Sequence, residues 1–280
     1  MIIGIDIGST TTKAVSVEEV PGSGTDDRRR VIRKIKTRAE DAVTSATGAF
    51  GKMIVENNIR MTDIERIMIT GAGAGKLTGN LFGIPTEKVD EIRAIGIGGM
   101  FQARRENIII TNIGTGTAII DAQRDSIVHL GGSGVGGGTI QGLAKKLLPT
   151  TDFNGIMELA AAGDLGQVDL RLGDIMDTWL SFLNRESTAS NFGKMLDSAR
   201  NEDIALGIIN MVYQVIGMLS VFAAKSRNTG RVVVTGNGSD NPLGKRVLAE
   251  LTGMYKIEFE YPADAAYTTA IGAGLSFAGF

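Results

Sequence analysis

The sequence of 280 residues contains no cysteine. This absence excludes a disulfide framework, a zinc site built on thiolates, a cysteine nucleophile and an iron–sulfur cluster held by cysteines. Any metal ion that the protein uses must therefore be bound by oxygen ligands.

The sequence also lacks an excess of charge of one sign and a long hydrophobic run. Its 29 basic and 31 acidic residues give a net charge of -2, so neither nucleic acid nor an anionic membrane is expected as a partner. No basic region precedes the first apolar residues, and we expect no stretch near the roughly 20 apolar residues of a membrane helix. We therefore expect a cytoplasmic protein that binds small molecules.

Glycine, in contrast, is abundant, with 38 residues that gather where predicted strands end. Glycine at strand ends is typical of a backbone that approaches a ligand closely. The 43% of hydrophobic residues is enough for one large domain or two medium ones.

One arrangement occurs twice: a strand, a turn of glycine and hydroxyl residues, and further strands. Strands are predicted over residues 1–7, 11–18 and 31–38, and again within NIIITNIGTGTAIIDA and SIVHL. The repetition suggests duplication of one unit in two lobes of an α/β protein, with a cleft between the turns.

The first turn lies in GIDIGSTTTK, residues 4–13. Its amides can cradle phosphate oxygens, its hydroxyls add donors, and Lys13 supplies a positive charge. Asp6, at the strand end, is placed to hold a hydrated Mg²⁺. A plain hairpin with Asp6 bonded to its own turn is the alternative, and the segment is not a Walker motif.

NIGTGT, residues 112–117, is the second such turn, although a hairpin alone explains it equally well. Two turns suit phosphoryl transfer, which needs donors on both sides of a polyphosphate. GGSGVGGGTIQGL, residues 131–143, then leads into a predicted helix with Thr139 near its start. We interpret this helix start as an anion site rather than a flexible linker, because a helix with core spacing follows at once.

Together with ITGAGAG and ASNFG, these motifs resemble the type II pantothenate kinases of the acetate and sugar kinase, Hsp70 and actin superfamily. The resemblance implies two ribonuclease H-like lobes with ATP between them. It also implies transfer of the γ-phosphate to the terminal hydroxyl of pantothenate, the first step of coenzyme A biosynthesis. The expected lobes are residues 1–106 with 264–280, and residues 107–263.

The resemblance also implies a nucleotide site made from both turns and the following helix. Phe153 is expected to stack on adenine, and two residues of a later glycine turn to lie near the base or ribose. The implied residues are Gly8, Ser9, Thr10, Thr11, Thr12, Lys13, Gly114, Thr115, Gly116, Gly137, Gly138, Thr139, Ile140, Gln141, Phe153, Asn237 and Gly238.

The catalytic carboxylate of the family falls on Glu91, which would accept the proton of the attacking hydroxyl. From the residues alone, Glu91 is an exposed charge at a helix start, and Asp90 and Glu87 are equally eligible.

A substrate segment is implied by TASNF, where Thr188, Ala189 and Asn191 match residues that contact pantothenate in the family. Without the resemblance, Ser190 and Asn191 are explained as a helix cap.

The sequence departs from the bacterial family at His129, where the family has an arginine that helps to hold the substrate and the reacting phosphate. Histidine is shorter and lacks the planar guanidinium fork. Arg93, two residues beyond Glu91, offers a compensating guanidinium. The departure at His129 leaves a related small alcohol open as the acceptor.

Two further expectations concern partners. The helix predicted over residues 202–225 resembles the dimer helix of these kinases, so a homodimer is expected, with burial in one subunit as the alternative. GIDIGSTTTKAV also resembles the activator ATPases of 2-hydroxyacyl-CoA dehydratases and benzoyl-CoA reductase. Those proteins hold an iron–sulfur cluster through cysteines, which this sequence lacks. The alternative function that this resemblance leaves open is an ATPase that couples to a partner enzyme without a cluster.

Overall fold

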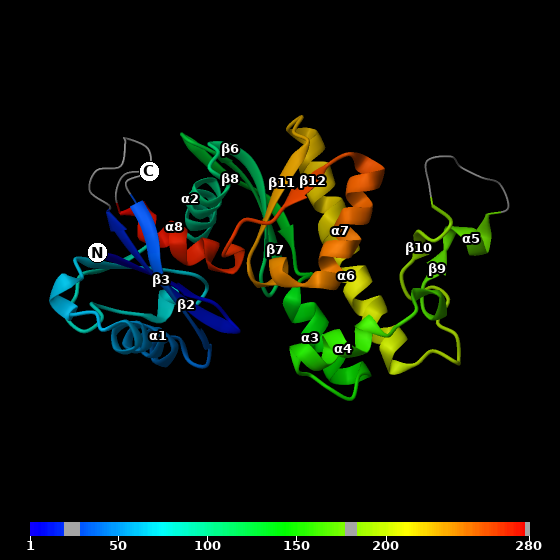
Figure 1. Ribbon diagram of the computed structural model, residues 1–280, viewed down its shortest axis with the longest axis horizontal. Coiled ribbons are helices and arrows are strands. Elements are labelled where there is room, and N and C mark those ends of the chain that lie inside the picture. Colours follow the sequence, from blue (N-terminus) through cyan, green and yellow to red (C-terminus); the bar gives the residue numbers. More distant parts are fainter. Residues whose placement is uncertain (20–28, 177–183, 278–280) are drawn as a thin grey trace.

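The computed structural model describes residues 1–19, 29–176 and 184–277, and it contains two five-stranded sheets (Figure 1). Both sheets have the same topology: three antiparallel strands, then two strands added in parallel. The duplicated unit expected from the sequence is therefore present as one strand order used twice. The first sheet runs β3 (Arg29–Arg38), β2 (Thr11–Glu19), β1 (Ile2–Ile7), β4 (Arg66–Thr70), β5 (Thr86–Lys88), and the second runs β8 (Ser126–Ser133), β7 (Thr117–Gln123), β6 (Asn107–Ile113), β11 (Arg231–Thr235), β12 (Glu258–Glu260).

Helices cover the sheets in layers. α1 (Ala42–Asn57) packs on one face of the first sheet. α8 (Thr268–Ser276) lies on the other face of that sheet, and α2 (Glu91–Ala103) lies on the second sheet, so both helices stand between the sheets (Figure 1). The outer face of the second sheet carries α3 (Gly137–Leu147), α4 (Phe153–Ala161), α6 (Asn201–Ser226) and α7 (Pro242–Tyr255).

α2 and α8 touch through their backbones. A Cβ atom on Gly98 would lie 2.0 Å from the Thr268 carbonyl oxygen, and one on Gly272 would lie 1.7 Å from the Ala94 carbonyl oxygen. Only glycine fits at such distances. Since α2 also packs directly on the second sheet, its assignment to the first lobe remains a prediction.

A smaller excursion interrupts the second half of the chain. β9 (Leu170–Arg171), α5 (Leu172–Ile175) and β10 (Thr188–Ser190) lie beyond α6, on the far side of that helix from α2 (Figure 1). Short 3₁₀ turns over Met61–Asp63, Ala74–Lys76, Leu165–Gln167, Asn237–Asp240 and Ala265–Tyr267 join the larger elements.

α6 corrects the expectation that no stretch approaches a membrane span. It is long enough, and its most apolar window has a mean hydropathy of 1.9. However, 61% of that window is buried, because Ile208, Val212 and Ile216 pack in the second core against the sheet and α7. Much of its hydropathy is therefore explained by this packing.

Candidate functional site

The first phosphate turn is the tight connection between β1 and β2, where the Gly8 amide donates to the Thr11 carbonyl at 3.2 Å. Asp6 and Lys13 are opposite each other in this hairpin. The Lys13 Nζ lies 3.4 Å from the Asp6 Oδ2, and both side chains are buried. The segment is thus a hairpin, but Asp6 bonds to lysine rather than to its own turn.

Burial of the Asp6 side chain makes its negative charge energetically unfavourable. Burial raises the pKa of its carboxyl group, and the neighbouring Lys13 ammonium offsets part of this effect. Gly71, at the end of β4, has a φ of +89°, and a Cβ there would lie 2.6 Å from the Asp6 Oδ1. The glycine of ITGAGAG therefore lets the chain turn close to this carboxylate.

The two predicted phosphate turns meet across the sheets. The Ser9 Oγ and the Thr115 Oγ1 are 2.5 Å apart. The Asn237 amide nitrogen donates to the Thr11 Oγ1 at 3.0 Å. Hydroxyl and amide groups from both halves of the chain thus converge at one place, as the paired motifs suggest. Gly114 and Gly116 close the second turn through an amide-to-carbonyl bond of 2.8 Å.

The hydroxyl residues of the first turn do not all face the same way. Side chains alternate along β2, so Thr12 shares a face with Ala14, which packs against α1. Thr11 and Lys13 are on the opposite face, toward the second sheet. Ser9 and Thr10 are exposed in the turn itself. For Thr12, the backbone rather than the hydroxyl is near the turn.

The start of α3 is tied to the second turn. The amides of Gly137 and Gly138 donate at 2.9 Å to the carbonyls of Gly114 and Thr115, and the Gly136 amide donates to the Thr139 Oγ1 at 3.1 Å. In this structure these amides bond within the chain, and the interpretation of the helix start as an anion site stays a prediction. The glycines of this segment also allow close packing, because a Cβ on Gly138 would lie 2.6 Å from the Thr115 Cγ2.

The other residues predicted to bind the nucleotide differ in their exposure. Ile140 is buried in the second core, whereas Gln141 is exposed on α3. Phe153 begins α4 with 43% of its surface exposed, so its ring is available to a flat ligand.

Tyr213 supports the later glycine turn, and the sequence pattern did not indicate it. This buried residue of α6 donates its hydroxyl to the Gly238 carbonyl at 2.6 Å. Burial raises the pKa of Tyr213 above its usual range, so the phenol stays a donor. Apolar spacing predicts its place in the core, but its partner is far away in sequence.

Three acidic residues near the start of α2 are eligible as the base, and the structure separates them. Asp90 is the helix cap, with its Oδ1 accepting from the Arg93 amide at 2.9 Å. Glu87 forms an ion pair with Arg66. Glu91 remains, in the first turn of α2 and under the electrostatic influence of Asp6 and Lys13.

Glu91 has an altered proton affinity although it is solvent-accessible. The protein around it raises the pKa of its carboxyl group through desolvation, and the charges of Asp6 and Asp90 add to this effect. Lys13 acts in the opposite sense. A carboxylate with a raised pKa, within the field of a lysine and a second carboxylate, is suited to general-base chemistry.

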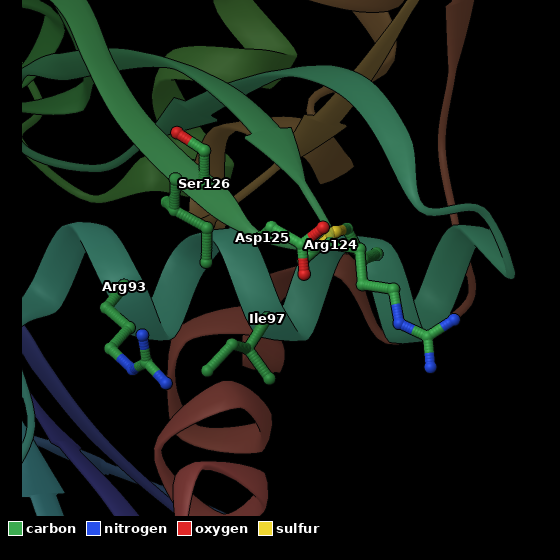
Figure 2. Close-up of a pocket in the computed structure, with 7 residues that line it drawn as sticks. Arg93, Ile97, Arg124, Asp125 and Ser126 are labelled. Atoms are coloured by element: carbon green, nitrogen blue, oxygen red, sulfur yellow. The ribbon is translucent and has the colours of Figure 1, made fainter. Parts of the chain in front are cut away.

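A pocket of about 380 Å³ lies between α2 and the hairpin of β7 and β8 (Figure 2). α2 presents Arg93 to it, and β8 contributes Ile127 to its wall. His129 is two residues further along β8 and is exposed on this edge strand. The remaining lining residues are Ile97, Met100, Arg124, Asp125 and Ser126.

The TASNF segment is fixed by a carboxylate that the sequence pattern did not indicate. Asp169 is fully buried and accepts from the Thr188 hydroxyl at 2.9 Å and from the Asn210 amide nitrogen at 2.8 Å. Asn191 contacts Gln214 at 3.3 Å, while Ala189 is exposed.

The helix-cap explanation of this segment is wrong. Residues 191–199 contain turns and irregular segments, and the next helix, α6, begins only at Asn201. Within this chain, β10 of this segment and α2 lie on opposite sides of α6 (Figure 1).

Oxygen ligands for a cation are few. Across the described residues, no group of three or more histidine, cysteine, aspartate or glutamate side chains is placed to hold a metal ion. Mg²⁺ is usually held by one or two carboxylates together with phosphate oxygens and water. A single carboxylate, that of Asp6, is therefore enough for a Mg²⁺ site. Thr70, the register partner of Asp6 on β4, adds a buried hydroxyl without a hydrogen-bond partner.

The sheets, their shared topology and the meeting turns define a two-lobed protein of the actin, Hsp70 and sugar kinase type. The fold matches the activator of the 2-hydroxyisocaproyl-CoA dehydratase from Clostridium difficile, with a TM-score of 0.64, 18% identity and coverage of 98% and 93% of the two chains. It also matches a ROK family glucokinase from Streptomyces griseus, with a TM-score of 0.58, 15% identity and coverage of 98% and 97%. The expected fold class is confirmed.

The sequence comparisons are more specific. The Fumble family model matches residues 106–273. A type II pantothenate kinase from Bacillus cereus is 30% identical over 99% of this chain and 97% of its own length. The chain therefore belongs to the family of the type II pantothenate kinases, as its motifs suggested.

The raised pKa of Glu91 predicts a change in stability. When the folded-state pKa exceeds the unfolded value, the ionised group destabilises the fold at neutral pH, and this cost disappears as the pH falls below the unfolded value. Glu91→Gln should therefore raise the melting temperature at pH 7 by about 1 °C, because screening limits the effect at an accessible site. Thermal unfolding at low ionic strength, at pH 7 and at pH 4, measures this difference in melting temperature between the variant and the wild type.

Glu87→Gln is the matched control, because it removes an ion pair with Arg66 and should give no gain. A Glu91→Gln variant that is less stable than the wild type at pH 7 would contradict the raised pKa.

Proposed function

We propose that the protein is an ATP-dependent kinase that phosphorylates the terminal hydroxyl of pantothenate. The observation that carries the proposal is Glu91, whose carboxyl group lies in the electrostatic field of Asp6 and Lys13, in a chain of this family whose two phosphate turns meet. We also propose that the reaction takes place in the cytoplasm, where ATP is available.

The proposed reaction is an in-line transfer of the γ-phosphoryl group to an alcohol. The turns around Ser9 and Thr115 would bind the phosphates from two sides, and Lys13 would neutralise part of their charge. Ionised Glu91 would accept the proton of the substrate hydroxyl as its oxygen attacks phosphorus. Asn237 and Gly238, held by Tyr213, would border the base or ribose.

Mg²⁺ is proposed as the metal ion, with Asp6 as its protein ligand. When bound, the ion would neutralise charge on the phosphates. The chain's own contribution is to keep the Asp6 carboxylate buried beside Lys13.

ATP turnover with and without pantothenate tests the assignment. We expect turnover to depend on pantothenate, with one phosphorylated product formed for each ATP consumed. Glu91→Gln should lower kcat by about 10²–10⁴-fold with nucleotide binding retained, because only the proton acceptor is lost. Steady-state kinetics and calorimetric titration with a non-hydrolysable ATP analogue measure both quantities.

Two outcomes would overturn the assignment. Turnover that ignores pantothenate and pantetheine and persists without any small alcohol would favour a cluster-free ATPase coupled to a partner enzyme. Turnover with another small alcohol but not with pantothenate would keep the kinase and replace the substrate.

The acceptor is proposed to lie between α2 and β8, with its carboxylate directed toward Arg93. Arg93 of α2 lines the pocket (Figure 2), and His129 is exposed on β8, two residues beyond the pocket residue Ile127. A guanidinium suits a carboxylate because it offers two parallel donors. This orientation would let Arg93 compensate for the histidine at position 129.

Arg93→Ala should therefore raise KM for pantothenate about tenfold, the effect of losing one charge-assisted hydrogen bond. KM for neutral pantetheine should not change, because pantetheine lacks the carboxylate. Arg124→Ala, at the far end of the pocket, is the control. Equal effects on both substrates, or none, would remove Arg93 from this role.

A homodimer through α6 is also proposed. Half-buried Met211, Val215 and Met218 form a stripe along α6 with Phe222, whose side chain is 59% exposed. TASNF is bonded to the same helix through Asn210 and Gln214, so a dimer along α6 would offer this segment to the partner's acceptor site.

Phe222→Glu should convert the dimer into monomers at micromolar concentration, because it buries a charge in an apolar contact. Val55→Glu alters another exposed apolar residue, on α1, and should leave the dimer intact. Analytical ultracentrifugation measures the oligomeric state of both variants. A wild-type protein that sediments as a monomer would end the proposal.

A further inference from the structure

Thr70 is the last residue of β4, and its side chain is fully buried. Its Oγ1 has no hydrogen-bond partner in the described structure. Burying a hydroxyl without a partner destabilises a fold, because the group loses its bonds to water and gains none. A valine of the same shape would avoid this cost.

The position of Thr70 is defined by two neighbouring elements. On one side, Thr70 is paired with Asp6 in the parallel register of β1 and β4, so both side chains are on the same face of the sheet. On the other side, the Val89 amide donates to the Ile69 carbonyl at 2.8 Å, and Asp90 begins the turn into α2. Thr70 therefore lies between Asp6 and the helix start that carries Glu91.

The surroundings of this hydroxyl are those of the catalytic region. Met68, two residues earlier on the same strand face, packs against Ala94 of α2. Toward the strand end, this apolar packing is replaced by the Asp6 and Lys13 pair. The unpartnered oxygen is therefore at the boundary between the inter-sheet core and the polar site.

We propose that Thr70 is part of the cation site and that its hydroxyl hydrogen-bonds water carried by the ion that Asp6 binds. A water molecule on such an ion would satisfy the Thr70 hydroxyl, which the ligand-free protein leaves without a partner. Outer-shell partners of this kind orient metal ligands and tune metal affinity. The inference rests on the proposed function only in requiring that the protein binds a magnesium nucleotide.

Thr70→Val tests this role because stability and cation binding should change in opposite directions. Without ligand, the variant should unfold at a higher temperature than the wild type. With a non-hydrolysable ATP analogue, its affinity for Mg²⁺ should fall about tenfold, the lower end of outer-shell effects. Thermal unfolding and calorimetric titration of Mg²⁺ into the nucleotide complex measure these changes without relying on activity.

Further variants separate this role from a structural one. Ser16 also has a buried, unpartnered hydroxyl, but it lies further along β2 and away from Asp6. Ser16→Ala should leave Mg²⁺ affinity unchanged. Thr70→Ser keeps the hydroxyl and should retain Mg²⁺ affinity within about twofold of the wild type, and Thr70→Ala replaces Thr70→Val if valine prevents folding.

Unchanged Mg²⁺ affinity in a folded variant without the hydroxyl would overturn the inference, as would an equal loss in Ser16→Ala. This result is distinguishable from failure of the proposed function. A protein that binds magnesium and nucleotide but does not phosphorylate pantothenate would refute the kinase assignment and still allow Thr70 to be tested.

Discussion

The close contact between α2 and α8 is the constraint on which the rest of the structure depends. Gly98 and Gly272 let the two backbones approach to a distance that a methyl group would forbid. α8 belongs by packing to the first sheet, and α2 lies directly on the second. This single helix pair thus sets the spacing of the sheets, and with it the distance between the phosphate turns at their ends.

Much of this organisation could be predicted from local patterns. Alternation and turn residues indicate the two hairpins, and their repetition indicates two lobes, because a strand and its turn are encoded by neighbouring residues. The first and last residues of the helices are predicted less accurately from the sequence. The apolar spacing predicts a helix from Glu40 to Asn57, but α1 begins at Ala42 because Asp41 accepts from the amides of Val43 and Thr44. A small-residue helix is likewise predicted from Asp264, but α8 begins at Thr268 because Asp264 adopts a left-handed conformation and a 3₁₀ turn intervenes.

The site contains contacts that no local pattern could indicate. Tyr213 reaches Gly238, and Asp169 reaches Asn210, across long separations in sequence. Apolar spacing predicts that α6 is buried, but it does not identify which turn a phenol or an amide on that helix will meet. The start of α3 is a further example, since the glycine run does not indicate that its amides bond to the carbonyls of Gly114 and Thr115.

The helices between the sheets also determine where Glu91 lies relative to the other charges of the site. Glu91 stands on a helix packed on the second sheet, whereas Asp6 and Lys13 belong to the first. α2 is nevertheless held against α8 and against Met68 of the first sheet, so the same contacts fix the separation of Glu91 from Asp6 and Lys13. Because the interaction energy between charges varies with their separation, a methyl group introduced at Gly98 or Gly272 would disturb the proton affinity of Glu91 as well as the packing of the helices.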